Sequence, residues 1–295
     1  MPGSRAGCPG RAPSIPHPGP PLGTIEPVFF SRSSRASAAS PSAQFSDDGL
    51  LATRSATVTV DTGTSDRTLL HNITVELSAP RTAVLGLNGS GKSTFLRLFN
   101  GLSQLTSGEV TVHGVSVSEH LPAVCSRVGM LFSDPGAQLV MPTGVEDVEL
   151  SLQHIKGKDT RRAAALEALA ERGVEHRAFD SVYNLSGGEK QLTALAAVLA
   201  VNPKVLLLDE PTTLLDLKNR LRLFDLLDSL PQQQVISTHD LDLAVTCDEA
   251  IVIHEGRLLA QGPAEDVLAD YQRWCSTDFP APSEPAEPQR PGGRA

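Results

Sequence analysis

Hydrophobic and polar residues alternate strictly in three short stretches of the first half of the chain. A period of two is typical of β-strands that bury one face and expose the other. The stretches are Thr57–Val60, Asn72–Leu77 and Glu109–His113. Because each would cover a core with one face only, they predict an antiparallel layer.

Short continuous apolar runs form a second pattern, which is typical of strands covered on both faces in a parallel sheet. These runs are Thr82–Leu85, Val128–Phe132, Val205–Leu208 and Gln234–Ser237. Near the end of the patterned part, Ile251–His254 and Arg257–Leu259 flank Gly256 and predict a hairpin.

Ala and Leu recur at helical spacing between these runs. The expected helices are Val145–Gln153, Arg161–Glu171, Glu189–Val201 and Leu217–Leu230, and another is expected to begin around Phe95–Phe99. The last-named segment, Leu217–Leu230, is expected to have one apolar side, formed by Leu217, Leu221, Phe224 and Leu227. Alternating strands and helices favour an α/β core with a mainly parallel sheet.

Both ends of the 295-residue chain differ in composition from the patterned part. Residues 1–54 and 276–295 are rich in Pro, Ser and Gly, so they bury too little apolar surface to offset their ordering entropy. We therefore predict two disordered tails and one domain over residues 55–275. The Arg- and Ser-rich N-terminal segment also resembles a transit peptide in composition, but its prolines forbid an amphipathic helix. A dispensable tail, a start upstream of the true one and a transit peptide all stay open.

Charge, hydropathy and cysteine usage limit the classes of function. The net charge of −9 argues against a broad nucleic-acid surface, so no nucleic-acid partner is expected. Hydrophobic residues make up 40% of the chain, but no apolar run approaches the roughly 20 residues that span a bilayer. We interpret the scattered Cys8, Cys125, Cys247 and Cys275 as reduced thiols of a cytosolic protein.

A glycine-rich stretch between a predicted strand and a predicted helix carries the strongest chemical signal. Residues 86–94, GLNGSGKST, fit the phosphate-binding pattern GxxxxGK[ST]. Glycines let backbone N–H groups surround phosphates, Lys92 can reach the β- and γ-phosphates, and the Ser93 hydroxyl can ligate Mg²⁺. The predicted ATP-binding residues are Asn88, Gly89, Ser90, Gly91, Lys92, Ser93 and Thr94.

Two acidic residues follow the apolar run Val205–Leu208. Asp209 is expected to hold Mg²⁺ opposite Ser93, and Glu210 is expected to polarise a water toward the γ-phosphate. The sequence therefore predicts Ser93 and Asp209 as metal ligands, Mg²⁺ as the cofactor and Glu210 as a catalytic residue.

A second glycine pair precedes the Glu189–Val201 helix. Ser186 is expected to cap this helix, and Gly187 and Gly188 leave backbone N–H groups bare for an anion. At this point the chain resembles the ATP-binding cassette family. The resemblance implies that Ser186, Gly187, Gly188 and Glu189 contact the ATP of the opposite subunit, in a head-to-tail pair that sandwiches two ATP molecules.

The resemblance covers roughly residues 55 to 272 and assigns two further positions. It implies that Asp216 communicates across the dimer and that His239, after a buried strand, is a catalytic contact of the γ-phosphate. It also implies a P-loop NTPase fold, with a RecA-like α/β core, an antiparallel β layer and a helical signature subdomain.

Two positions depart from the family pattern. Ser133 stands where the family usually has a longer Gln side chain that reaches Mg²⁺ and the attacking water. Residues 61–68 offer no aromatic to stack on adenine. Ser133 is therefore expected to act through a bridging water or to leave hydrolysis slow, and base stacking to be missing or supplied by another group.

Residues 132–143, FSDPGAQLVMPT, indicate the branch of the family. They resemble ATPases of energy-coupling factor importers and, together with TTLLD at 212–216, most resemble the biotin type. Cobalt- or nickel-type, shared vitamin-type and generic importer ATPases are the alternatives. The resemblance implies a peripheral subunit at the cytoplasmic face of the cell membrane. Its implied partners are a membrane coupling protein, a substrate-capturing membrane protein and a second copy or paralogous ATPase.

Three classes of function follow from these patterns. The leading hypothesis is a transport ATPase. A soluble cassette ATPase acting on DNA or ribosomes is disfavoured by the single cassette and the acidic balance. An ATP-binding regulatory subunit with little hydrolysis stays open because of Ser133.

Overall fold

The computed structural model describes residues 43–63 and 65–280. Most of the two predicted tails, residues 1–42 and 281–295, lies outside the described residues. The described part contains two β-sheets and nine α-helices around three apolar clusters. Over these ranges, no helix combines the length and the apolar character that crossing a membrane requires.

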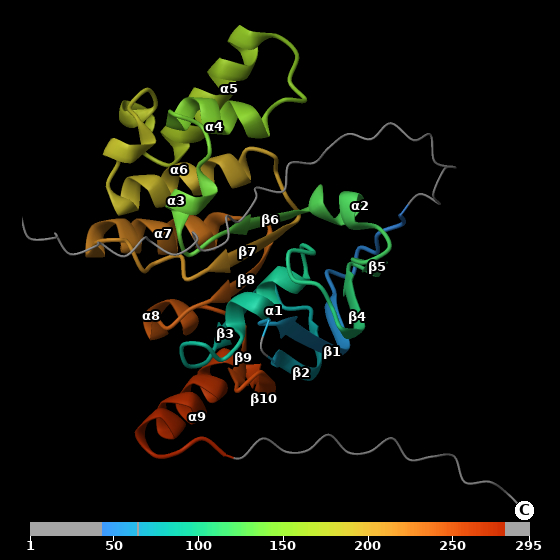
Figure 1. Ribbon diagram of the computed structural model, residues 1–295. Coiled ribbons are helices and arrows are strands. Elements are labelled where there is room, and N and C mark those ends of the chain that lie inside the picture. Colours follow the sequence, from blue (N-terminus) through green and yellow to red (C-terminus); the bar gives the residue numbers. More distant parts are fainter. Residues whose placement is uncertain (1–42, 64, 281–295) are drawn as a thin grey trace, which may run out of the picture. The chain divides into compact units, whose positions relative to one another are not determined.

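A six-stranded sheet forms the centre of the domain (Figure 1). The strand order is β10-β9-β3-β8-β7-β6, with β10 antiparallel to β9 and all other neighbours parallel. The strands are β3 (Arg81–Leu85), β6 (Val128–Leu131), β7 (Val205–Asp209), β8 (Gln233–Ser237), β9 (Glu249–His254) and β10 (Arg257–Pro263). The predicted parallel sheet and the predicted hairpin are confirmed. The carboxyl ends of β3, β8 and β7 therefore meet at one edge.

The second sheet is antiparallel throughout, as the alternating stretches predict. Its order is β2-β1-β4-β5. The strands are β1 (Leu51–Asp61), β2 (Asp66–Leu77), β4 (Ser107–Val112) and β5 (Val115–Ser116).

Strand β1 begins four residues before the domain boundary expected at residue 55. Leu51 is fully buried and pairs with Leu77 on one side and Val112 on the other. Upstream, the guanidinium of Arg127 lies 3.9 Å from the ring centroid of Phe45. The expected boundary is thus too late, because a few apolar residues beside a Ser- and Asp-rich stretch do not change the local composition.

Helices flank both sheets. The α-helices are α1 (Lys92–Leu98), α2 (Leu121–Cys125), α3 (Pro135–Gln138), α4 (Gly144–Ser151), α5 (Lys158–Glu171), α6 (Gly187–Leu199), α7 (Leu217–Ser229), α8 (Leu241–Ala244) and α9 (Ala264–Ser276), and two 3₁₀ turns are η1 (Glu175–Arg177) and η2 (Val182–Asn184). Helices α1, α4, α5, α6 and α7 correspond to predicted ones. The four or five residues of α2, α3 and α8 are too short to show a period.

Successive residues of the central strands point into two different cores. Val84 and Leu207 face a cluster shared with α1 and the antiparallel sheet, so α1 lies between the two sheets (Figure 1). Leu85 and Leu208 face the opposite cluster, built with α6, α7, α8 and α9. A third cluster joins α4, α5 and α6 into the predicted helical subdomain.

The expected apolar side of α7 is only partly buried: of its residues, Phe224 and Leu227 pack in the core. Leu223 and Leu227 are fully buried, whereas Leu217 is 66% exposed and Leu221 is 53% exposed. The helix is apolar over more than one side, and spacing alone does not show which side meets the core. Leu217 and Leu221 are left as an apolar strip at the start of α7.

The chain also stays packed beyond the C-terminal boundary expected at residue 276. The Phe279 ring stacks on His254, with ring centroids 4.3 Å apart and an interplanar angle of 2°. Its centroid lies 6.0 Å from that of Tyr271 in α9. Aromatic contacts stabilise this residue despite its Pro-rich surroundings, so the predicted tail begins too early.

Candidate nucleotide-binding site

Residues 86–94 form the loop between β3 and α1, and two of its glycines have no room for a side chain. Gly86 has φ +148°, and a Cβ there would lie 2.1 Å from the carbonyl oxygen of Ile253. Gly91 has φ +110°, and its Cβ would lie 2.7 Å from Cδ2 of Leu70. Glycine is therefore required where the loop curls against β9 and β2.

The start of α1 leaves backbone donors free. Its N-cap is Gly91, which has no side chain to accept from the first N–H groups of the helix. Those groups and the positive end of the helix dipole favour an anion. They adjoin a hollow of about 290 Å³, which is lined by Asn88, Gly89, Gly91, Lys92, Ser93, Thr94, Glu210, Arg67 and Leu69. Of the predicted ATP-binding residues, only the buried Ser90 does not line this hollow.

Lys92 is held over the loop by its own backbone. The buried Nζ donates to the carbonyl oxygens of Gly86 at 2.9 Å and Leu87 at 3.3 Å. Oε1 of Glu210 lies 3.8 Å away. The ammonium group is thus placed at the hollow, in position to contact phosphate oxygens.

Asp209 is fully buried at the end of β7 and has one occupied and one free carboxylate oxygen. The hydroxyls of Ser93 and Ser237 both donate to Oδ1, at 2.9 and 2.6 Å. Oδ2 accepts no hydrogen bond from any described residue, and Nη2 of Arg97 is 3.9 Å away. A buried carboxylate oxygen without a donor is costly unless a cation binds it.

This donor set fits Mg²⁺, which takes few protein oxygens and completes its shell with phosphates and water. Asp209 and Ser93 would hold the ion, and the Ser237 hydroxyl would keep the carboxylate oriented. When bound, the ion would neutralise charge on the phosphate oxygens.

We expect Asp209→Asn to raise the Mg²⁺ concentration for half-maximal ATP turnover by about 10-fold or more, because the neutral amide binds the cation poorly. The amide oxygen still accepts from Ser93 and Ser237, so the melting temperature should change little. Turnover measured across a Mg²⁺ titration checks the first point, and thermal unfolding checks the second. An unchanged Mg²⁺ dependence would contradict this assignment.

Glu210 and His239 lie together at the edge where β7 and β8 end. Nδ1 of His239 lies 2.6 Å from Oε2 of Glu210, and the backbone N–H of His239 donates to the same oxygen at 3.2 Å. The backbone of Glu210 is left-handed, with φ +51°, and its N–H donates to the carbonyl of Ser237 at 2.9 Å. Such backbone strain in a non-glycine residue is typical of functional sites. The two predicted catalytic residues are in contact.

The predicted signature residues lie elsewhere. Ser186 caps α6 in a capping box: its hydroxyl accepts from the N–H of Glu189 at 3.3 Å, and Glu189 accepts from the N–H of Ser186 at 2.8 Å. Hydrogen bonds from the Ser186 N–H and hydroxyl, helped by Arg177, lower the pKa of Glu189. None of Ser186–Glu189 lines the hollow beside Lys92. That they contact the ATP of another subunit stays a prediction.

Asp216 is the N-cap of α7, where its side chain accepts from the N–H of Asn219 at 2.8 Å. The preceding Leu214 adjoins the signature, since a Cβ on Gly187 would lie 3.2 Å from Cβ of Leu214. The predicted dimer contact and the signature therefore share one face of the domain.

The two departures from the family pattern are visible at the site. Ser133 follows the end of β6, is half-buried and does not line the hollow. No aromatic residue is among the described residues that line the hollow, whereas Arg67 and Leu69 of β2 are. A guanidinium can stack on a base, so Arg67 is a group that could replace the missing aromatic.

Three residues of the site were missed by sequence reasoning. Ser237 and Arg97 adjoin Asp209, and the buried Gln191 of α6 donates to the carbonyl of Pro211 at 3.2 Å. Ser237 ends a strand beside β7, which is a signal that could have found it. The other two depend on tertiary packing.

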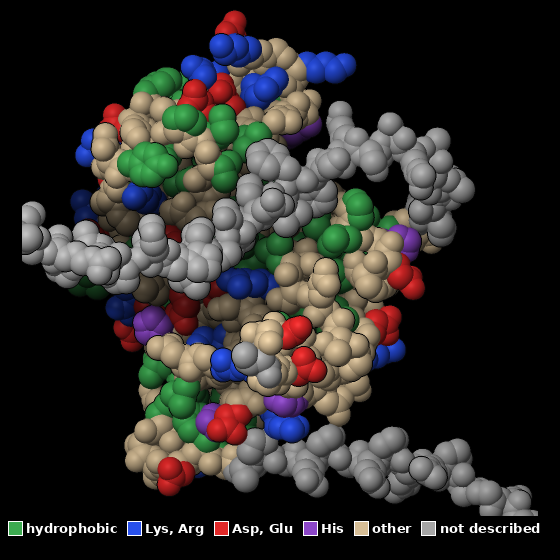
Figure 2. Space-filling view, viewed as in Figure 1, with side chains coloured by type: hydrophobic (Ala, Val, Ile, Leu, Met, Phe, Trp, Pro, Cys, Tyr) green, Lys and Arg blue, Asp and Glu red, His purple; other side chains and the backbone are tan. Residues whose placement is uncertain are grey.

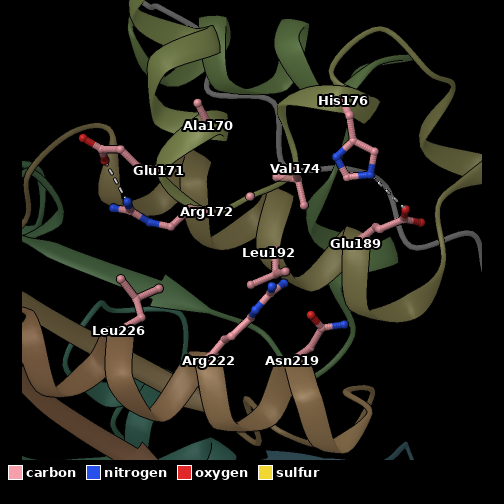
Figure 3. A pocket seen from close by; sticks show the side chains of 11 residues that line it. Ala170, Glu171, Arg172, Val174, His176, Glu189, Leu192, Asn219, Arg222 and Leu226 are labelled. Atoms are coloured by element: carbon pink, nitrogen blue, oxygen red, sulfur yellow. Dashed lines mark hydrogen bonds and ion pairs between the residues drawn. The ribbon is translucent and has the colours of Figure 1, made fainter.

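A larger hollow of about 590 Å³ lies between α7 and the helical subdomain (Figure 3). Arg222 rises from α7 toward Leu192 in it, and His176 faces Glu189 at its rim, 3.9 Å away (Figure 3). It contains no residue of the phosphate loop and neither Asp209 nor Glu210. It is therefore distinct from the nucleotide site.

Known proteins resemble the chain over the region that builds this site. A family model described as "ABC transporter" matches residues 70–213. The biotin transport ATP-binding protein BioM of Rhizobium etli is 40% identical over 207 residues, which cover 70% of this chain and 92% of BioM.

Solved structures agree with the fold. The ATP-binding cassette MJ0796, solved as a dimer in a post-hydrolysis state with ADP and Pi, is 28% identical with a TM-score of 0.67, covering 72% of this chain and 98% of that one. Another solved structure is that of cbiO1 from Clostridium perfringens, part of the ABC transporter complex cbiONQ. It is 29% identical with a TM-score of 0.65, and the match covers 79% of this chain and 95% of cbiO1. The chain belongs to the ATP-binding cassette family and is an ATP-hydrolysing subunit of an ABC transporter.

Proposed function

We propose that this chain drives an energy-coupling factor importer, with biotin as the transported substrate. The observation that carries the proposal is the 40% identity to a biotin transport ATP-binding protein over 92% of that protein's length. A vitamin of another kind or a metal ion is the second candidate, because the chain is also similar to ATPases whose names do not mention biotin, such as cbiO1 of the ABC transporter complex cbiONQ.

The chemistry proposed for the site is transfer of the γ-phosphoryl group to water. Lys92 and the free N–H groups of α1 would bind the β- and γ-phosphates. A water would attack the γ-phosphorus while Glu210 accepts its proton and the bond to the β-phosphate oxygen breaks, leaving ADP and phosphate. His239, beside Glu210, would contact the γ-phosphate and orient that carboxylate.

The proposal includes a second cassette, either another copy or a paralogue. The signature residues do not reach their own chain's hollow, so a second chain would bring its signature to it. Leu214, Leu217 and Leu221 are exposed on either side of Asp216 in the sequence, and Leu214 adjoins the signature. Covering these apolar side chains would contribute to closing the pair.

A groove of about 250 Å³ beside α3 supports the proposed membrane partner. It is lined by Gly136, Leu139, Val140, Met141, Pro142, Ser181, Val182, Tyr183 and Lys190. Figure 2 shows hydrophobic side chains over the helical part of this face. The Asp147 carboxylate accepts from the N–H groups of Val140 and Met141 at 2.7 and 2.8 Å, so the groove wall is fixed. An apolar helix end of a membrane coupling protein fits such a groove at the cytoplasmic face.

Purification from the native cells in mild detergent, with mass spectrometry of what is retained, tests this function. We expect a small membrane coupling protein together with a substrate-capturing membrane protein. Capture of biotin by the second partner would support the proposed substrate. Recovery of large two-domain permeases, ribosomes or DNA-bound proteins instead would overturn the importer type.

We expect Val140→Glu to reduce recovery of the membrane partners by about 10-fold, because a charge would enter an apolar contact. Val140 is 68% exposed, so the isolated chain should fold and bind ATP as before. Val245→Glu is the matched control, since Val245 is 56% exposed after α8 and lies outside the groove. Equal recovery with both variants would contradict this use of the groove.

A further inference from the structure

Arg220 joins the start of α7 to the segment that carries His239. It lies one turn after Asp216, and its Nη2 donates to Oδ1 of Asp240 at 2.7 Å. Nε lies 2.6 Å from Oδ2 of the same carboxylate, and Nη2 lies 2.5 Å from Oδ2 of Asp242. The Nε contact is a close ion pair that lacks hydrogen-bond alignment. One guanidinium therefore holds two carboxylates of the next segment.

Of the two carboxylates, Asp240 is the better placed. Its side chain is 11% exposed, whereas that of Asp242 is 80% exposed, so water screens the Asp242 pair more. Asp240 is also the N-cap of α8 and accepts from the N–H groups of Asp242 and Leu243 at 3.2 and 3.4 Å. Its own N–H donates to Thr238 Oγ1 at 3.0 Å. Asp240 therefore fixes the backbone on both sides of itself.

His239 immediately precedes Asp240 and depends on that backbone for its position. Its ring is largely exposed, and among the described residues its polar partner is Glu210, at 2.6 Å. A shift of Asp240 would move the His239 backbone N–H and ring away from Oε2 of Glu210. Arg220 thus binds Asp240, Asp240 directly follows His239 in the chain, and His239 contacts Glu210.

The same helix segment also carries exposed apolar residues. Leu217 and Leu221 flank Arg220 in sequence and are exposed on α7, next to the Asp216 cap. A second cassette that binds to this strip would contact the helix from which Arg220 extends. The Arg220 guanidinium also lies 5.3 Å from the Phe224 ring centroid, which limits its freedom to swing away.

We propose that Arg220 is a positioning residue that holds His239 against Glu210 and links His239 to the exposed strip of Leu217 and Leu221 on α7. This inference rests on the proposed roles of Glu210 and His239. Docking of a second cassette on the strip of Leu217 and Leu221 would be transmitted through Arg220 and Asp240 to the hydrolytic site. Removing the guanidinium would leave ATP bound but His239 misplaced.

The test is the ATP turnover of the full-length chain carrying Arg220→Ala, His239→Ala or both. We expect Arg220→Ala to lower kcat by about 10-fold with KM changed by less than about twofold. Because Arg220 acts through His239, the double variant should be no slower than His239→Ala alone. Arg220→Lys keeps one ion pair and should recover part of the lost kcat, which also covers the case in which Arg220→Ala folds poorly.

Arg222→Ala is the matched control, two residues further along the same helix. Arg222 extends into the hollow of Figure 3, forms no ion pair within 43–63 and 65–280, and is absent from the nucleotide site. Its loss should leave kcat unchanged, whereas an equal loss in both Arg variants would mean a general effect on α7 and would overturn the inference.

The outcomes separate the inference from the proposed function. If His239→Ala is slow and Arg220→Ala is as fast as wild type, Arg220 has no positioning role and the function stands. If both are slow and their effects multiply in the double variant, Arg220 acts elsewhere and the inference is overturned. If His239→Ala turns over at the wild-type rate, the proposed role of His239 fails, and the inference fails with it.

Discussion

Glu210→Gln is expected to lower ATP turnover by at least about 100-fold while leaving ATP affinity within a few-fold of wild type. The amide has the size of the carboxylate. Its oxygen can still accept from the N–H of His239, which lies 3.2 Å from Oε2 of Glu210 in the wild-type chain. It cannot accept the proton of the attacking water. Binding through Lys92 and the first N–H groups of α1 does not involve this proton transfer, so only the chemical step should slow.

The measurement is single-turnover hydrolysis together with nucleotide binding, on the purified chain and on its membrane complex. Glu255→Gln is the matched control: Glu255 also follows a strand with a left-handed backbone, φ +48°, but it is exposed in the β9–β10 turn. Normal turnover of that variant would show that exchanging a carboxylate for an amide after a strand does not by itself slow hydrolysis. Turnover of Glu210→Gln near the wild-type rate would remove Glu210 from the mechanism.

The catalytic edge was predictable because its residues follow the ends of strands. An apolar run of four residues, Val205–Leu208, indicates a buried strand, and the acids after it must emerge where parallel strands end. The phosphate loop follows β3 for the same reason. The parallel order β3-β8-β7 then brings Lys92, Asp209 and Glu210 to one edge without further information.

Other parts of the site were not predictable, because they depend on which surfaces meet. Arg220 and Arg222 are two similar residues on one helix, and only the packing of α7 shows that one reaches Asp240 while the other enters a solvent hollow. The apolar side expected for α7 is likewise only partly the buried one, since the apolar residues of this helix occupy more than one side. A period locates a helix, but the neighbouring elements decide its orientation.

Gly86→Ala is expected to abolish ATP binding and to lower the free energy of unfolding by about 3 kcal/mol. A steric clash and a strained backbone both oppose this substitution. The added methyl would lie 2.1 Å from the carbonyl oxygen of Ile253 and 2.6 Å from Oγ of Ser90. That carbonyl belongs to β9, which pairs with β3 up to Leu85, so it cannot retreat without breaking the ladder. The loop must move instead, and Lys92 loses the Gly86 carbonyl that positions it.

Gly173→Ala separates the clash from the backbone strain. Gly173 follows α5 with φ +72° and has no atom within 4 Å of an added Cβ, so the substitution introduces a left-handed alanine and nothing else. That strain should lower the free energy of unfolding, measured with urea, by about 1 kcal/mol and leave nucleotide affinity unchanged. If Gly86→Ala were no more destabilising than this control and still bound ATP, the close approach of the loop to β9 would not be what shapes the phosphate site. A larger loss confined to Gly86→Ala would mean that packing against β9, rather than the flexibility of glycine, holds the loop in its binding form.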